Sequence, residues 1–198
     1  MDKKYISVDV ETTGPTPGKY SMLSLGACIV GDTSRKFYRE LKPLNGNYIL
    51  EAMKVGCLGL FCIKSFEHNV EYNPKSEEFN PRKVLKRLFQ VGQTPEEAMS
   101  DFADWINQNT NGFEPIEAAA PIKFDGMFTA WYFDNFYSGK NPLGYSGIDI
   151  KSMYRGLMKD EHASTKDLVG KKLPHNALED AIIQAEEFEI VLKKMKYC

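Results

Sequence analysis

Cysteine is scarce in this sequence, and its four cysteines are not arranged to bind zinc. Cys28, Cys57, Cys62 and Cys198 contain no C-x-x-C pair and no accompanying histidine pattern, so we expect four reduced thiols and no disulfide. The sequence also lacks a P-loop, a G-x-S-x-G elbow and a G-x-G-x-x-G turn. These absences exclude the enzyme classes that those motifs define.

Long hydrophobic runs and an excess of charge of one sign are absent as well. No apolar run reaches transmembrane length and no signal peptide is evident, so we expect a cytoplasmic protein with no membrane partner. The net charge is −2 and the pI is near 6.0, which argues against a protein that coats nucleic acid nonspecifically. With 198 residues and 42% hydrophobic content, we expect a single domain with a substantial core over 1–198.

The most informative segment is ISVDVETTG, residues 6–14, in which Asp9 and Glu11 end an apolar run. Residues i and i+2 of a strand point to the same face, so both acids project together where the strand ends. Two like charges held together need a cation, and oxygen ligands suit Mg²⁺ or Mn²⁺. A D-x-E pair also fits a solvated turn, so a metal site requires further carboxylates elsewhere.

Two later segments supply them. Asp125 follows a short apolar stretch and precedes an aromatic-rich helical pattern, and His175 and Asp180 lie in the segment PHNALED. A spacing of five residues is about 140° around a helix, so these two would not share a helical face. We therefore expect a helix capped by Asn176, with Glu179 at its third position as in a capping box, Asp180 in its second turn and His175 outside it.

With these residues in this order, the chain resembles the DEDDh 3′→5′ exonucleases. This family has a ribonuclease H-like fold and includes proofreading subunits, oligoribonucleases and RNase T-like enzymes. A related subgroup has tyrosine four residues before the last acid, and because Asn176 stands there, the histidine subgroup is the better match. The positions that match the family's three motifs are Asp9, Glu11, Thr12, Thr13, Gly14, Asp125, His175, Ala177 and Asp180.

The resemblance implies a mechanism and cofactors. Two Mg²⁺ or Mn²⁺ ions about 4 Å apart would align the attacking water and stabilise the departing 3′ oxygen. His175 would be the general base, a role that a neutral imidazole suits near pH 7. Single-stranded RNA or DNA would be shortened from its 3′ end to nucleoside 5′-monophosphates. The catalytic and metal-binding acids would be Asp9, Glu11, Asp125 and Asp180.

Two segments are expected to bind substrate. In this family the Thr12-Thr13-Gly14 turn approaches the terminal nucleotide, and glycine permits a left-handed turn and close approach. An ordinary turn is the alternative, because prolines and another glycine follow. Many relatives carry a histidine-glycine pair in the segment that corresponds to residues 55–60. Here Leu58 or Leu60 would contact the terminal bases by apolar contact alone.

Residues 62–92 look like an insertion beside that segment, with a turn-rich part at 69–81 and a short helical pattern at 84–89. It would select substrate, form a homodimer surface or be a decorative loop. Two basic clusters could contact phosphates or simply be solvated faces. They are Arg82, Lys83, Lys86 and Arg87, and, just before His175, Lys166, Lys171 and Lys172.

The order of the expected elements fits an α/β ribonuclease H-like fold, a mixed sheet flanked by helices. Pro121 interrupts the last strand before Asp125, so we expect that strand to be short, bulged or at an edge. Thr94 and Pro95 are strong signals for the start of a helix. The expected strands are 4–10, 22–30, 35–41 and 116–124, and the expected helices are 95–109 and 177 to about 195.

Two other functions stay open at this point. One is a binding or assembly module that keeps the fold without catalysis, although such a module has no need to hold four acids together. The other is a metal-dependent phosphodiesterase or phosphatase that acts on small nucleotides. Dependence of the activity on oligonucleotide length would separate the second from an exonuclease.

Overall fold

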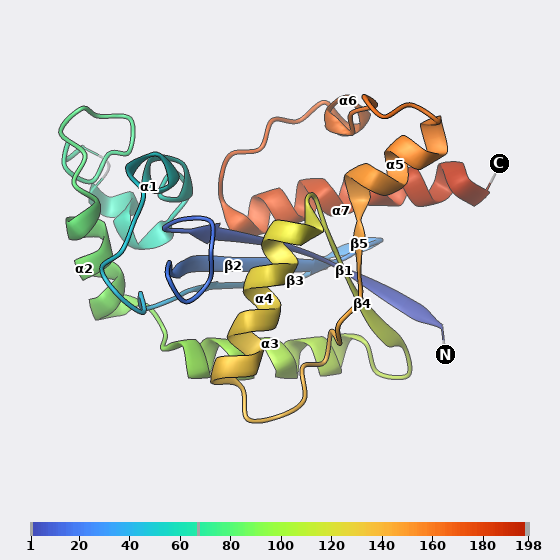
Figure 1. The fold of residues 1–198 in the computed structure, drawn as a ribbon, viewed down its shortest axis with the longest axis horizontal. Coiled ribbons are helices and arrows are strands. Elements are labelled where there is room, and N and C mark those ends of the chain that lie inside the picture. Colours follow the sequence, from blue (N-terminus) through green and yellow to red (C-terminus); the bar gives the residue numbers. More distant parts are fainter. Residues whose placement is uncertain (1, 67, 197–198) are drawn as a thin grey trace.

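A computed structural model describes residues 2–66 and 68–196. A five-stranded mixed sheet of order β3-β2-β1-β4-β5 forms its centre (Figure 1). The β1–β2 and β2–β3 pairs are antiparallel, and the β1–β4 and β4–β5 pairs are parallel. The predicted mixed sheet is therefore confirmed. The strands are β1 Lys3–Thr12, β2 Met22–Ile29, β3 Asp32–Glu40, β4 Glu114–Ala119 and β5 Gly147–Asp149.

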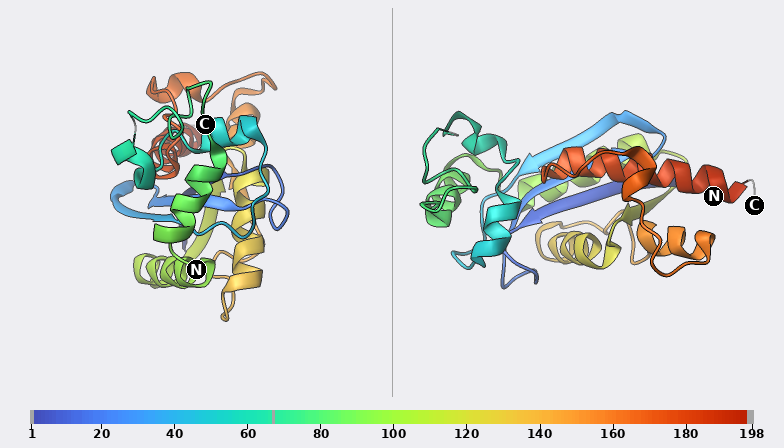
Figure 2. Two further views of the ribbon diagram at one scale, coloured as in Figure 1. Left: turned by 90° about the vertical axis from the view of Figure 1, so that its left-hand side faces the viewer. Right: turned by 90° about the horizontal axis from the view of Figure 1, so that it is seen from above.

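Helices cover both faces of the sheet (Figures 1 and 2). Aromatic side chains of α3 and α4 pack on one face against Ile6, Val8 and Val10. The long helix α7 lies on the other face, against β1 and β2, and packs beside α5. The helices of the described residues are α1 Leu50–Gly56, the 3-10 helix η1 Phe61–Phe66, α2 Pro81–Val91, α3 Pro95–Asn109, α4 Ile122–Phe136, α5 Ile150–Met158, α6 Lys166–Val169 and α7 Ala177–Lys196.

The helices at 95–109 and from 177 are confirmed. In α3, Thr94 and Glu97 form a complete capping box before Pro95. In α7, the Asn176 side chain caps the helix, and Ala181, Ala185 and Phe188 are fully buried.

The expected strand at 116–124 is wrong in its extent. Strand β4 ends at Ala119, and α4 begins at Ile122, so Asp125 lies in the first turn of a helix rather than after a strand. Pro121 stands between the two elements, with a cis peptide bond to Ala120. Because it follows the strand, its missing N–H interrupts no ladder, and β4 is a short strand between β1 and β5 rather than an edge.

The insertion predicted at 62–92 contains more helix than the sequence pattern indicated. It begins within η1, passes through turns and ends in α2, which is longer than the expected 84–89. Glu40 at the end of β3 accepts hydrogen bonds from the Phe61 and Cys62 N–H groups. Lys83 of α2 forms an ion pair with Glu71 in the turns, so both ends of the segment are fastened.

Three of the cysteines, Cys28, Cys57 and Cys62, are free thiols, as expected, and burial raises the pKa of each. Cys198 lies outside the described residues. Within those residues, no helix combines the length and the apolar character that crossing a membrane requires.

Candidate active site

The acid pair lies at the end of the central strand β1. Asp9 pairs with Gly26 of β2, and Glu11 pairs with Ser24. A Cβ on Gly26 would lie 2.2 Å from the carbonyl carbon of Ala177, so only glycine lets the start of α7 pack this closely on the sheet. The first turn of α7 is therefore brought against the strand that is paired with Asp9.

Asp125 is tied to the same strand. The parallel pairing of β1 with β4 stops at Ser7, so Val10 has no ladder partner on that side. Its N–H donates to the Asp125 Oδ1 atom at 3.1 Å instead. The carboxylate of α4 thus satisfies a backbone donor between the two acids of β1, which places it at the site even though it lies on a helix.

His175 and Asp180 come from the start of α7, as predicted. Asn176 Oδ1 accepts from the N–H groups of Leu178 and Glu179, both at 3.1 Å. His175 precedes this cap with a φ of 59°, in the left-handed region that non-glycine residues rarely adopt. Because of this left-handed backbone, the chain changes direction at His175, and the histidine is not part of the helix.

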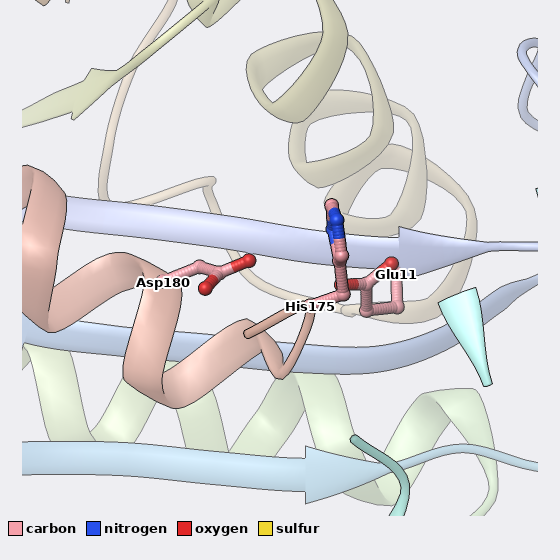
Figure 3. Close-up of side chains that lie close together, drawn as sticks. All are labelled: Glu11, His175 and Asp180. Carbon is pink, nitrogen blue, oxygen red and sulfur yellow. The ribbon is translucent and has the colours of Figure 1, made fainter. Parts of the chain in front are cut away.

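These residues converge (Figure 3). Ligand atoms of Glu11, His175 and Asp180 all lie within 4.8 Å of one another, although they come from β1, the loop before α7 and α7 itself. Asp9 and Asp125 belong to the same cluster, because the charges of Asp125, Glu11 and Asp180 raise the pKa of Asp9, and the charges of Asp180 and Asp125 raise the pKa of Glu11. All five predicted catalytic residues are therefore brought to one place.

The cluster is costly to ionise without a counter-charge. Burial is the main cause that raises the pKa of Glu11 and of Asp125 to about 8 and that of Asp180 to about 7. The pKa of Asp9 is also raised, first by burial and then by the charges of Asp125, Glu11 and Asp180. Carboxylates in such surroundings are stabilised in their ionised form by a cation.

Among the buried side-chain oxygens of the described residues that have no hydrogen-bond partner, two belong to α7 at this cluster: Asp180 Oδ1 and Gln184 Oε1. Gln184 lies one turn after Asp180, and its Nε2 donates to Asp9 Oδ1 at 2.7 Å. An orphaned carboxylate oxygen beside three further acids is what a divalent cation would satisfy. The donor set therefore fits a metal site.

The predicted substrate-binding turn is held by its own side chains. Thr12 Oγ1 donates to the Gly14 carbonyl, and Thr13 Oγ1 accepts from the Ser21 N–H, both at 2.9 Å. The expectation of a left-handed Gly14 is wrong: the positive φ of this turn is at Gly18. A Cβ on Gly14 would instead lie 2.6 Å from the Tyr20 ring, so packing explains this glycine.

The two candidate wedge residues differ in exposure. Leu58 is 36% exposed, whereas Leu60 is 3% exposed and packs with Leu23 and Met53 in a core under the insertion. Of this pair, Leu58 is the side chain that offers apolar surface to solvent.

The basic clusters are partly engaged in internal contacts. Arg87 donates to the Cys62 carbonyl and lies over the Phe66 ring, and Lys83 pairs with Glu71. Lys171 pairs with Glu186 of α7 at 2.6 Å. These residues fasten the insertion and the loop before α7.

Two contacts at the site were not predicted. One is the bond from Gln184 to Asp9, for which the signal was present, since residue 184 shares a helical face with Asp180 and is polar. The other is the bond from Asn176 Nδ2 to the Gly59 carbonyl at 2.6 Å. It joins positions 117 residues apart, and no local pattern indicates it.

Known structures define the class of the fold. The nuclease domain of 3′hExo, a DEDDh family member bound to rAMP, aligns over 97% of this chain and 92% of its own, with a TM-score of 0.66 and 12% identity. Exonuclease I of E. coli in complex with a dA16 oligonucleotide aligns over 99% of this chain and 43% of its own, with a TM-score of 0.65 and 13% identity. The fold is that of the ribonuclease H-like exonucleases.

A sequence relative defines the family. The chain is 35% identical over 197 residues to the 3′–5′ DNA exonuclease Cap18 of Escherichia coli, an alignment that covers 96% of this chain and 91% of Cap18. No family model matches the sequence. The chain belongs to the DEDDh 3′→5′ exonucleases, which confirms the resemblance seen in the sequence.

Proposed function

We propose that this protein is a metal-dependent exonuclease that removes nucleoside 5′-monophosphates from the 3′ ends of single-stranded DNA. The observation that carries the proposal is the convergence of Glu11, His175 and Asp180 within 4.8 Å, beside Asp9 and Asp125. DNA is the expected polymer because the relative that aligns with nearly the whole chain is a DNA exonuclease.

Asp9, Glu11, Asp125 and Asp180 would hold the cations, Mg²⁺ or Mn²⁺. The unpartnered Asp180 Oδ1 and the raised pKa values of the four acids support this assignment. When bound, two such ions would supply the Lewis acidity that makes hydroxide available at neutral pH and neutralises charge on the departing oxygen.

His175 is the proposed general base. His175 has a left-handed backbone just before α7, and the side chain of the following residue, Asn176, holds this segment to the Gly59 carbonyl. The imidazole would take the proton of the attacking water at one of its ring nitrogens and later release it to solvent. Gln184 orients Asp9 by donating to one carboxylate oxygen, which leaves the other free to bind a cation.

A time course on 5′-labelled single-stranded DNA and RNA of equal sequence tests the proposal. With Mg²⁺ or Mn²⁺, we expect a ladder that shortens from the 3′ end, faster on DNA, and no ladder with EDTA. His175→Gln should lower kcat by about 10²-fold or more if it is the general base.

The other outcomes have distinct meanings. Hydrolysis of a dinucleotide without shortening of either long strand would indicate a small-nucleotide phosphodiesterase. An equal rate on RNA and DNA would contradict the assigned polymer but not the activity.

A further inference from the structure

A pocket of about 560 Å³ lies between the insertion and the start of α7. Its walls come from the loop at 57–60, from η1 and from the turns at 68–75, and Pro174, Asn176 and Glu179 close it on the α7 side. This volume is in the range of sites that hold small ligands. None of the five catalytic candidates lines it, but Leu58 and Leu60, the predicted contacts of the terminal bases, do.

The pocket is nevertheless adjacent to the catalytic residues. Pro174 and Asn176 flank His175 in sequence, and Glu179 precedes Asp180. The Asn176 side chain crosses to the Gly59 carbonyl, and a Cβ on Gly59 would lie 2.5 Å from the Asn176 Cβ. The short segment that contains His175 is thus held against Gly59, and its neighbours Pro174 and Asn176 line the pocket.

The lining has the chemistry of a nucleotide site. Lys64 and Lys75 are exposed at the pocket, and the described lining contains one carboxylate, Glu179. Neither lysine has an ion-pair partner among the described residues. In a chain of net charge −2, this is a local excess of positive charge.

Apolar and aromatic surface lies beside the two lysines. Phe61 is 51% exposed, with its ring packed at 4.9 Å on Tyr38. Tyr72 is half-buried and stacks at 4.8 Å on Phe66. An aromatic ring that is held in place by packing against a second ring can stack with a base, and lysines beside it can bind phosphates.

We propose that this pocket binds the single-stranded DNA upstream of the scissile phosphodiester. This inference rests on the proposed function. The terminal nucleotide must lie at the acid cluster, and only the part of the strand on the 5′ side extends beyond it. The strand would place phosphates near Lys64 and Lys75 and a base against the exposed Phe61.

The test compares two double variants that remove equal charge. Lys64→Ala/Lys75→Ala removes the lysines of the pocket, and Lys140→Ala/Lys194→Ala removes two exposed lysines outside it. Binding of a labelled single-stranded DNA 12-mer is measured by fluorescence anisotropy with EDTA, so that no cleavage occurs. We expect the first variant to bind about tenfold more weakly, with a salt slope less steep by about 1.4, and the control to bind like the wild type.

Kinetics with Mg²⁺ complete the test. The first variant should show a raised KM for the 12-mer with unchanged kcat, and unchanged kinetics on a dinucleotide that cannot reach the pocket. The inference is overturned if wild-type protein does not bind the 12-mer, if both double variants lose equal affinity, or if the dinucleotide is affected as much as the 12-mer. If the proposed function is wrong, the result is different: the wild-type protein binds the 12-mer normally but does not shorten it from the 3′ end.

Discussion

The catalytic cluster and the pocket beside it are built on different kinds of backbone. The acids lie on β1, α4 and α7, and Glu11, Asp125 and Asp180 are each less than one-tenth exposed. The pocket is lined by a loop, a 3-10 helix and turns, and it exposes Phe61 and Leu58. The comparison teaches that the acids of the site are fixed by regular elements, whereas the proposed contacts with the rest of the strand are carried by an irregular segment that a family can vary.

The largest effect should come from the catalytic cluster. Asp180→Asn should lower kcat by about 10³-fold or more, because it removes a proposed metal ligand from a set that acts as a unit. Without metal, its melting temperature should be equal to or higher than that of the wild type, since a buried carboxylate becomes neutral. Glu189→Gln, on an exposed part of α7, is the matched control and should leave kcat unchanged. A large loss of stability in Asp180→Asn would contradict this interpretation.

The next largest effect should come from Asn176, whose bond to Gly59 joins the segment of the catalytic histidine to the wall of the pocket. Asn176→Ala removes a helix cap and leaves the Gly59 carbonyl without its donor, so we expect a loss of about 2–3 kcal/mol in the free energy of unfolding. Asn176→Asp keeps the cap and loses only the donor, so it should be less destabilised. Urea unfolding measures both, and Asn176→Asp would be as stable as the wild type if the bond to Gly59 contributed nothing.

The stability of the metal-free protein should depend on pH through the acids of the catalytic cluster. In the metal-free protein, the raised pKa values of Glu11, Asp125 and Asp180 make the native state hold more protons than the unfolded state between about pH 4 and pH 8. Stability should therefore fall as the pH rises through this window, and Mg²⁺ should reduce the fall. Melting temperatures at about pH 5 and pH 8, with and without Mg²⁺, measure this dependence.

A control separates the cluster from a neighbouring acid. Burial also raises the pKa of Glu117 to about 7, and this carboxylate accepts a hydrogen bond from the hydroxyl of Thr129 on α4. Glu117→Gln should remove part of the pH dependence without changing the response to Mg²⁺. A response to Mg²⁺ that vanished in this variant would place the metal elsewhere.

The smallest effect is expected at Gln184. Gln184→Met keeps the volume and loses the hydrogen bond to Asp9, which should weaken Mn²⁺ binding by about tenfold while the fold is retained. Gln90→Met on the exposed side of α2 is the control. Calorimetric titration with Mn²⁺ measures both, and equal affinities would show that Asp9 needs no such support.

Much of the fold could be predicted because its signals are local. The alternation around Asp9 predicts β1, and Thr94 with Pro95 predicts the start of α3. Asn176 likewise predicts the start of α7, and with it the different placement of His175 and Asp180. These are patterns of two to six residues, and the structure preserves each of them.

What could not be predicted depends on contacts between distant segments. Asp125 reaches the site from a helix because the Val10 N–H has no ladder partner, which requires knowing where β4 stops. Gly14 and Gly26 are explained by what packs on them, Tyr20 and the start of α7, not by their own turns. The pocket requires the insertion to fold back on the segment before α7, and no periodicity in residues 62–92 indicates that.

The most direct test of the central claim is a Mn²⁺ titration followed by electron paramagnetic resonance, on wild-type protein and on Asp9→Asn. If the acids of β1, α4 and α7 form one metal-dependent site, the wild type should bind two Mn²⁺ ions per chain and Asp9→Asn should lose at least one. The variant Lys64→Ala/Lys75→Ala should bind Mn²⁺ like the wild type. No Mn²⁺ binding by the wild type, or binding that is unchanged in Asp9→Asn, would contradict the account.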